Sequence, residues 1–129
     1  AANPFLIALE GYSFNSINRS FDIGEAGGVA RLLAFDAGIE LVVVPPVMLK
    51  RFVSGSWTAS KKKMIKSVAK YYDMATQDDN LADAAGLAKL AAVYLVNKSA
   101  RRCELEVVKQ LRNPKAKKKT RFKRERTNI

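Results

Sequence analysis

The stretch IELVVV, Ile39 to Val44, decides the fold class. It is short and rich in β-branched residues, and it is apolar on both faces apart from Glu40. Such a run is typical of a strand inside a parallel sheet whose two faces are covered by helices. Pro45 and Pro46 end the strand, and a proline at the first helical position favours a short helix over VMLKRFV (47–53). The stretch therefore predicts an α/β protein.

The residues before this strand predict a second strand and a helix. PFLIALEGYSF (4–14) is an apolar run between turn formers, and it carries the acid Glu10 near its carboxyl end. GEAGGVARLLAFDAG (24–38) has helical spacing of its apolar residues, and Gly38 is a natural stop. The apolar residues with this spacing are Val29, Leu32, Leu33 and Phe35.

The residues after the strand predict helices only. SGSWTAS (54–60) is a loop, and Ser60 is a suitable N-cap for a helix over KKKMIKSVAKYYDM (61–74). The inner face of that helix is expected to carry Met64, Ile65, Val68 and Tyr72. DDNLADAAGLAKLAAVYLV (78–96) is a helix of small apolar residues, which continues or restarts through RRCELEVVKQLR (101–112) before Pro114.

The predicted sheet is too small to stand alone. Two parallel strands that are apolar on both faces leave their edges unpaired, and sheets of this kind usually have about four to six strands. The sequence also starts with Ala1 and not with Met. We therefore expect the first strands of the sheet to be missing from this chain.

Composition limits the possible functions. The chain has 129 residues, enough for one domain, and 23 basic residues against 12 acidic ones, which indicates a polyanionic partner. It has no His and one Cys, so a disulfide within the chain is excluded and a metal site has to be built from oxygen ligands. No apolar run is long enough to cross a bilayer and no signal peptide is present, so we expect a soluble, intracellular protein.

The positive charge is concentrated at the carboxyl end. Nine of the basic residues and only one acid lie in residues 112–129. We expect a folded domain over residues 1–112 and a basic, disordered tail over residues 113–129. The tail is either an arm that follows DNA phosphates or a solubilising end.

Acidic residues cluster at the start of the helix over residues 78–96. Asp79 and Asp83 are four apart and Asn80 and Asp83 three apart, so they share one helix face. A carboxylate on a buried face has to be paired or hold a metal. In the alternative interpretation, Asn80 is the N-cap and Asp83, at the third helical position, offsets the helix dipole.

A second acid can reach the same place. Functional groups of parallel sheets collect at the carboxyl ends of the strands, where Glu10 lies. Two carboxylates at one edge make a hard oxygen site that suits Mg²⁺ or Mn²⁺. Paired metals of this kind activate water for phosphodiester hydrolysis.

Four segments together resemble a known family. ALEGYSF, GEAGGVARLLAF, IELVVVPPVMLKRFVSGSWTASKK and DDNLADAAGLA have the order and spacing of the later two thirds of a RuvC-type Holliday junction resolvase, over residues 5–90. The resemblance implies a ribonuclease H-like fold, a mostly parallel sheet flanked by helices. It also implies a Mg²⁺-dependent (or Mn²⁺-dependent) endonuclease for branched DNA, active as a homodimer in the cytoplasm of a bacterial or phage-infected cell, or in an organelle.

The resemblance also implies roles for single residues. Glu10 matches the second catalytic carboxylate and Asp83 the last, while Asn80 stands where the family has another metal ligand, so that Asp79 or Asp78 can take its place. The family begins with a strand of the type GIDPG, whose Asp is the first ligand, and no stretch here matches it. We expect an amino-truncated resolvase, with a degenerate relative as the alternative. The chain alone should be a poor nuclease.

Candidate DNA contacts follow from the same resemblance. Lys50 and Lys61 match lysines that face the DNA backbone, and Lys62, Lys63 and Lys66 would extend that surface unless they are simply solvated. Tyr12 and Phe14 are candidates for an aromatic wedge at the branch point. Trp57 either stacks on an unpaired base or caps the core.

Two other functions fit parts of the sequence. A non-catalytic DNA-binding or assembly protein would keep the fold without the chemistry. A small basic RNA-binding protein would explain the tail, but it leaves the arrangement of Glu10 and Asp83 without a cause.

Overall fold

The computed structural model describes residues 4–11 and 20–114. The two candidate wedge residues, Tyr12 and Phe14, lie outside the described residues, and so does the tail from residue 115 onward. Within the described part of the chain, no helix combines the length and the apolar character needed to cross a membrane.

The two predicted strands are present and parallel. β1 (Leu6–Glu10) pairs with β2 (Glu40–Val44), with Leu6 opposite Glu40 and Glu10 opposite Val44. The pairing is extended beyond the strands by the Gly11 N–H, which donates to the Val44 carbonyl at 2.8 Å. Because the strands run in the same direction, their carboxyl ends lie at one edge, and Glu10 lies at that edge.

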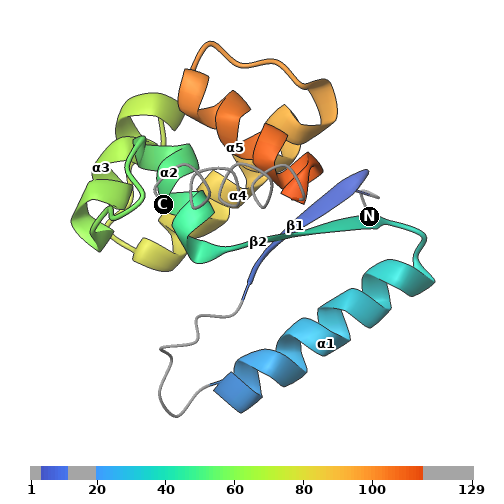
Figure 1. The fold of residues 1–129 in the computed structure, drawn as a ribbon. Helices are drawn as coiled ribbons and strands as arrows, with labels where there is room; N and C mark the ends of the chain where they lie inside the picture. Colours follow the sequence, from blue (N-terminus) through green and yellow to red (C-terminus); the bar gives the residue numbers. More distant parts are fainter. Residues whose placement is uncertain (1–3, 12–19, 115–129) are drawn as a thin grey trace, which may run out of the picture.

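The helix between the strands lies alone on one side of the sheet. α1 (Ser20–Asp36) is separated by β1 and β2 from the other helices (Figure 1). It ends at Asp36, followed by the predicted stop Gly38, which has φ +66°. The Ile39 N–H closes the turn by donating to the Ala34 carbonyl at 2.9 Å. Ala34 is buried. The large apolar residues that predicted the helix, Val29, Leu32, Leu33 and Phe35, are all exposed.

Two helices follow β2 directly. α2 (Pro46–Ser54) begins at the predicted proline, and Gly55 ends it with φ +80°. α3 (Lys61–Tyr72) has the predicted N-cap, because the Ser60 hydroxyl accepts the Lys63 N–H at 3.2 Å.

The helix with the acidic start is α4 (Asp79–Val96), and the cap that the alternative interpretation gave it is wrong. Asp78, not Asn80, is the N-cap, and its Oδ1 accepts the Asn80 N–H at 2.8 Å. Asp83 therefore lies one turn into the helix, beyond the first turn where acids offset the dipole. Asn97 ends α4 with φ +52°, and the chain restarts as α5 (Arg102–Arg112).

The core lies between the sheet and the four later helices (Figure 1). Its largest apolar side chains come from α2 and α4, which cross beside the sheet, and α5 closes the far side with Val107 and Val108. The expected inner face of α3 is buried at Met64 and Val68 and half-buried at Ile65 and Tyr72. Burial of these apolar residues is the main stabilising contribution to the fold.

A buried polar network ties α5 to α2 and α3. The Glu104 side chain is 1% exposed, and it accepts hydrogen bonds from the Tyr72 hydroxyl at 2.9 Å, from Arg101 at 3.0 Å and from the Ser99 hydroxyl. Arg101 also donates to the carbonyls of Phe52 and Val53, the last turn of α2. The buried carboxylate is thus fully paired, as a buried charge has to be.

Gly86 lets α4 approach α2 closely. A Cβ atom at this position would lie 2.5 Å from Val53 Cγ2 and 3.2 Å from Leu49 Cδ1, both of them on α2. Only glycine allows this separation. Gly86 is three residues after Asp83, so the close approach also fixes the part of α4 that carries this acid.

We predict opposite effects for the same substitution at two helical glycines. Gly86→Ala should lower the free energy of unfolding by about 1–3 kcal/mol, because the new methyl group overlaps the stiff Val53 side chain. Gly28→Ala in α1 should raise it by about 0.5–1 kcal/mol, because nothing lies within 4 Å of that Cβ position and alanine favours the helix. Urea unfolding measures both values. Equal effects would show that the α2–α4 contact is looser than described.

Candidate metal-binding site

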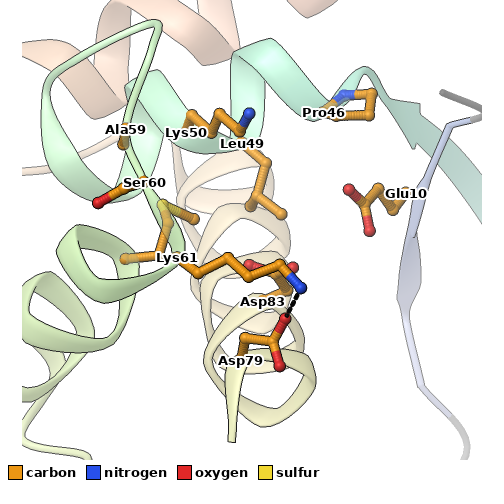
Figure 2. Close-up of a pocket in the computed structure, with 10 residues that line it drawn as sticks. Glu10, Pro46, Leu49, Lys50, Ala59, Ser60, Lys61, Asp79 and Asp83 are labelled. Atoms are coloured by element: carbon orange, nitrogen blue, oxygen red, sulfur yellow. Dashed lines mark ion pairs between the residues drawn. The ribbon is translucent and has the colours of Figure 1, made fainter. Parts of the chain in front are cut away.

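A cavity of about 310 Å³ opens at the carboxyl edge of the sheet. β1 supplies one wall and the amino-terminal halves of α2, α3 and α4 supply the others (Figure 2). Its charged lining residues are Glu10, Lys50, Lys61, Asp79 and Asp83, and the others are Pro46, Leu49, Ala59, Ser60 and Met64. Two acids predicted to meet from distant parts of the sequence, Glu10 and Asp83, therefore share one cavity.

Each charged group is placed by a well-defined local structure. Glu10 is the last residue of β1 and is fixed by pairing with Val44. Lys50 lines the cavity because α2 starts directly after β2, at the same edge of the sheet. Lys61 is the first residue of α3, directly after the Ser60 cap. Asp79 and Asp83 lie one turn apart on α4.

Glu10 and Asp83 are held in an environment that disfavours their charge. Partial burial, which removes water from the carboxylate, raises the pKa of Glu10, and the negative charge of Asp83 raises it further. Partial burial raises the pKa of Asp83, and the charge of Asp79 adds to the effect. Lys50 acts against the rise in the pKa of Glu10, and Lys61 and Lys50 act against the rise in the pKa of Asp83, without reversing either. A cation placed between the two acids would relieve this unfavourable energy.

Asp79 has a partner of its own. Its Oδ2 accepts an ion pair from Lys61 Nζ at 2.8 Å, and this contact holds the pKa of Asp79 below its usual range (Figure 2). The same contact raises the pKa of Lys61. Asp79 is thus the acid of the cavity that is already neutralised.

Other candidate residues lie away from the cavity. Asn80 is exposed and does not line it, whereas Asp79 does. Lys62 and Lys63 are exposed on the first turn of α3 and do not line the cavity either. The ring of Trp57 lies 5.7 Å from the Arg51 guanidinium, in the loop between α2 and α3.

The cavity fits a divalent ion only in part. Within the residues described, no group of three or more His, Cys, Asp or Glu side chains is gathered closely enough to hold a metal ion. Mg²⁺, however, is often bound by one or two carboxylates together with water and substrate phosphates. Glu10 and Asp83 could supply those two carboxylates, and an ion there would polarise a phosphodiester and activate water.

Sequence reasoning missed two features of the site. The first is the ion pair between Lys61 and Asp79, which are 18 residues apart on different helices and share no local pattern. The second is the apolar wall of Leu49 and Met64, which looked like ordinary core residues. For the close approach of α4 to α2 the sequence did offer a signal, Gly86, because a glycine inside a helix of good helix formers often has a packing reason.

No family model matches the sequence, and no curated protein does. The structure, however, is similar to that of RuvC from Thermus thermophilus, with a TM-score of 0.61 and 27% identity, over 73% of this chain and 58% of the Thermus chain. A structure of T. thermophilus RuvC in complex with a Holliday junction substrate has the same TM-score and identity, over 71% of this chain and 58% of that one. The predicted resemblance and the ribonuclease H-like α/β fold are thereby confirmed. The chain spans less than two thirds of the proteins it matches.

We predict that Asp83→Asn stabilises the metal-free protein. A carboxyl group whose pKa is raised by folding favours the protonated native state, so stability falls as the pH rises through its ordinary value of about 4 up to the raised pKa. At pH 7 the substitution should raise the free energy of unfolding by up to about 1 kcal/mol, a gain limited by solvent screening. Near pH 4 the difference should shrink.

Unfolding in EDTA at pH 7 and pH 4 measures this effect. Glu40→Gln, at the exposed start of β2, is the matched control and should change stability by less than about 0.5 kcal/mol. Lower stability of Asp83→Asn at pH 7 would show that the charged carboxylate is well satisfied without a metal.

Proposed function

We propose that this protein is a metal-dependent endonuclease that recognises branched DNA by shape and hydrolyses phosphodiester bonds. The observation that carries the proposal is the shared cavity of Glu10 and Asp83, two acids whose pKa values are both raised there. Raised pKa values in a cleft are typical of functional sites. The similarity to RuvC supports a junction-resolving nuclease at the level of the family.

The roles of the residues follow from their chemistry. When bound, Mg²⁺ or Mn²⁺ would supply a polarised phosphate and an activated water. Glu10 and Asp83 would hold the ion at the edge of the sheet. Lys50 and Lys61, which line the same cavity, would hold the phosphate backbone beside them without reading its sequence. Lys62 and Lys63 would extend this basic surface along the first turn of α3.

We predict that Glu10→Gln and Asp83→Asn each abolish cleavage. In the full-length gene product, Mg²⁺-dependent cutting of a four-way junction should fall at least about 100-fold, because loss of a ligand should cost no less than loss of an outer-shell partner. Junction binding in EDTA should be retained. A gel assay for cutting and fluorescence anisotropy for binding measure the two effects.

Glu40→Gln is the matched control for Glu10. Glu40 is an exposed glutamate at the opposite end of the same sheet, facing Leu6, and its substitution should leave cleavage unchanged. Cutting by Glu10→Gln and Asp83→Asn at the rate of the unmodified protein would remove both acids from the mechanism.

A second candidate is a non-catalytic protein that binds branched DNA. The lack of a close group of three acidic or other metal-binding side chains among the described residues favours it. It predicts tight binding of a four-way junction and no cutting with Mg²⁺ or Mn²⁺ by the full-length protein. The cleavage assay therefore separates the two functions.

We infer that two copies of the protein pair through α1. Val29, Leu32 and Leu33 form an exposed apolar row, with Phe35 beside them at 82% exposure. Exposed apolar patches of this kind are uncommon on a free surface and typical of interfaces. A dimer would bring two cavities to one junction, so that two strands can be cut.

We predict that Leu33→Lys converts the dimer to a monomer. A buried lysine without a partner is costly in an apolar interface, whereas it is tolerated on a free surface. Light scattering coupled to size-exclusion chromatography measures the mass. Leu95→Lys, at another half-exposed leucine late in a helix, is the control and should leave the mass unchanged. A monomer for the unmodified protein would contradict the pairing.

A further inference from the structure

The ion pair between Lys61 and Asp79 bridges the two helices that begin at the cavity. Lys61 is the first residue of α3 and Asp79 the first residue of α4, and both line the cavity. The Lys61 side chain extends across the opening to reach Asp79 (Figure 2). Nζ and Oδ2 are 2.8 Å apart. The pair therefore lies where a ligand of the cavity would enter.

The pair divides the three acids of the cavity into two kinds. Asp79 is neutralised by its contact with Lys61, whereas the pKa values of Glu10 and Asp83 stay raised although Lys50 acts against the rise in both and Lys61 acts against it in Asp83. Asp79 and Asp83 are four residues apart, so their side chains lie on the same face of α4. The contact with Lys61 occupies the Asp79 carboxylate, so Asp79 differs from Asp83 in having a close cationic partner.

The bond is easily exchanged. The Lys61 side chain is 85% exposed and that of Asp79 is 35% exposed. Ion pairs so open to water are weakly held and are screened by salt. A phosphate group competes well for an exposed ammonium group, because lysine binds phosphate as a point charge that can be reoriented.

We propose that Lys61 couples metal binding to DNA binding by exchanging its partner. Without DNA, Lys61 pairs with Asp79. When a backbone phosphate takes the ammonium group, the Asp79 carboxylate becomes available as a third oxygen ligand beside Glu10 and Asp83. Metal binding and phosphate binding then strengthen one another by the same factor, as linkage requires. This inference rests on the proposed metal-dependent function and adds a regulation of its site.

The test compares Mn²⁺ affinity in a set of variants without DNA. Lys61→Gln frees Asp79 permanently and should bind Mn²⁺ about three- to tenfold more tightly than the unmodified protein, the gain expected from releasing one exposed pair and adding one ligand. Lys62→Gln removes the same charge from the next residue and should change the affinity by less than about twofold. The double variant Lys61→Gln/Asp79→Asn should lose the gain. Isothermal titration at constant ionic strength measures all four proteins.

The reverse coupling is measured on DNA. Fluorescence anisotropy of a short unbranched duplex, with and without Mn²⁺, gives the strengthening of DNA binding by the metal. In Lys62→Gln, Mn²⁺ should strengthen DNA binding as much as in the unmodified protein. In Lys61→Gln the strengthening should be smaller, by about the factor by which the Mn²⁺ affinity of this variant rises in the titration.

The outcomes distinguish a failure of the partner exchange from a failure of the proposed metal-dependent function. Equal Mn²⁺ affinities for Lys61→Gln and Lys62→Gln, in a protein whose Mn²⁺ binding is lost in Asp83→Asn, would overturn the exchange and leave the metal site intact. Mn²⁺ binding that is indifferent to Asp83→Asn would overturn the metal site and the exchange together.

Discussion

The repulsion between carboxylates at the edge of the sheet is the constraint on which the rest of the structure depends. Glu10 and Asp83 come from opposite parts of the chain, and free side chains of equal charge would move apart. They stay together because the backbone of each is held in place. Glu10 is held by strand pairing with β2, and Asp83 by the approach of α4 to α2 at Gly86. The core thus supplies the energy that holds an unfavourable charge arrangement in place.

The polar network of Arg101 and Glu104 at the carboxyl end of α2 also helps to hold the helices that line the cavity. Arg101 binds the last carbonyls of α2, and Glu104 joins Arg101 to Tyr72 at the end of α3. α2 carries Lys50 and α3 carries Lys61, so fixing the carboxyl ends of both helices also restricts their amino ends at the cavity. Helices of 9 and 12 residues would otherwise pivot on few contacts.

Local patterns predicted the elements and the two central acids, but not their surroundings. The β-branched run ending at Val44, the Ser60 cap and Gly38 each act over a few residues, and all three are found as expected. The cap of α4 in the alternative interpretation was wrong because Asp78, Asp79 and Asn80 are all good capping residues, so residue type alone does not choose among them. The pairing of Lys61 with Asp79 depends on how two helices cross, which no local pattern encodes.

The charges of the cavity bear on the proposed binding of both a metal and DNA by a basic protein. Its three carboxylates and two lysines give a local charge of one negative, in a chain whose net charge is +11. An empty cavity would therefore repel a phosphate that the rest of the protein attracts. One divalent ion would reverse the local sign, so the cavity would attract phosphate more strongly when the cation is present. The same carboxylate repulsion that destabilises the fold would thereby couple phosphate binding at the cavity to the proposed metal.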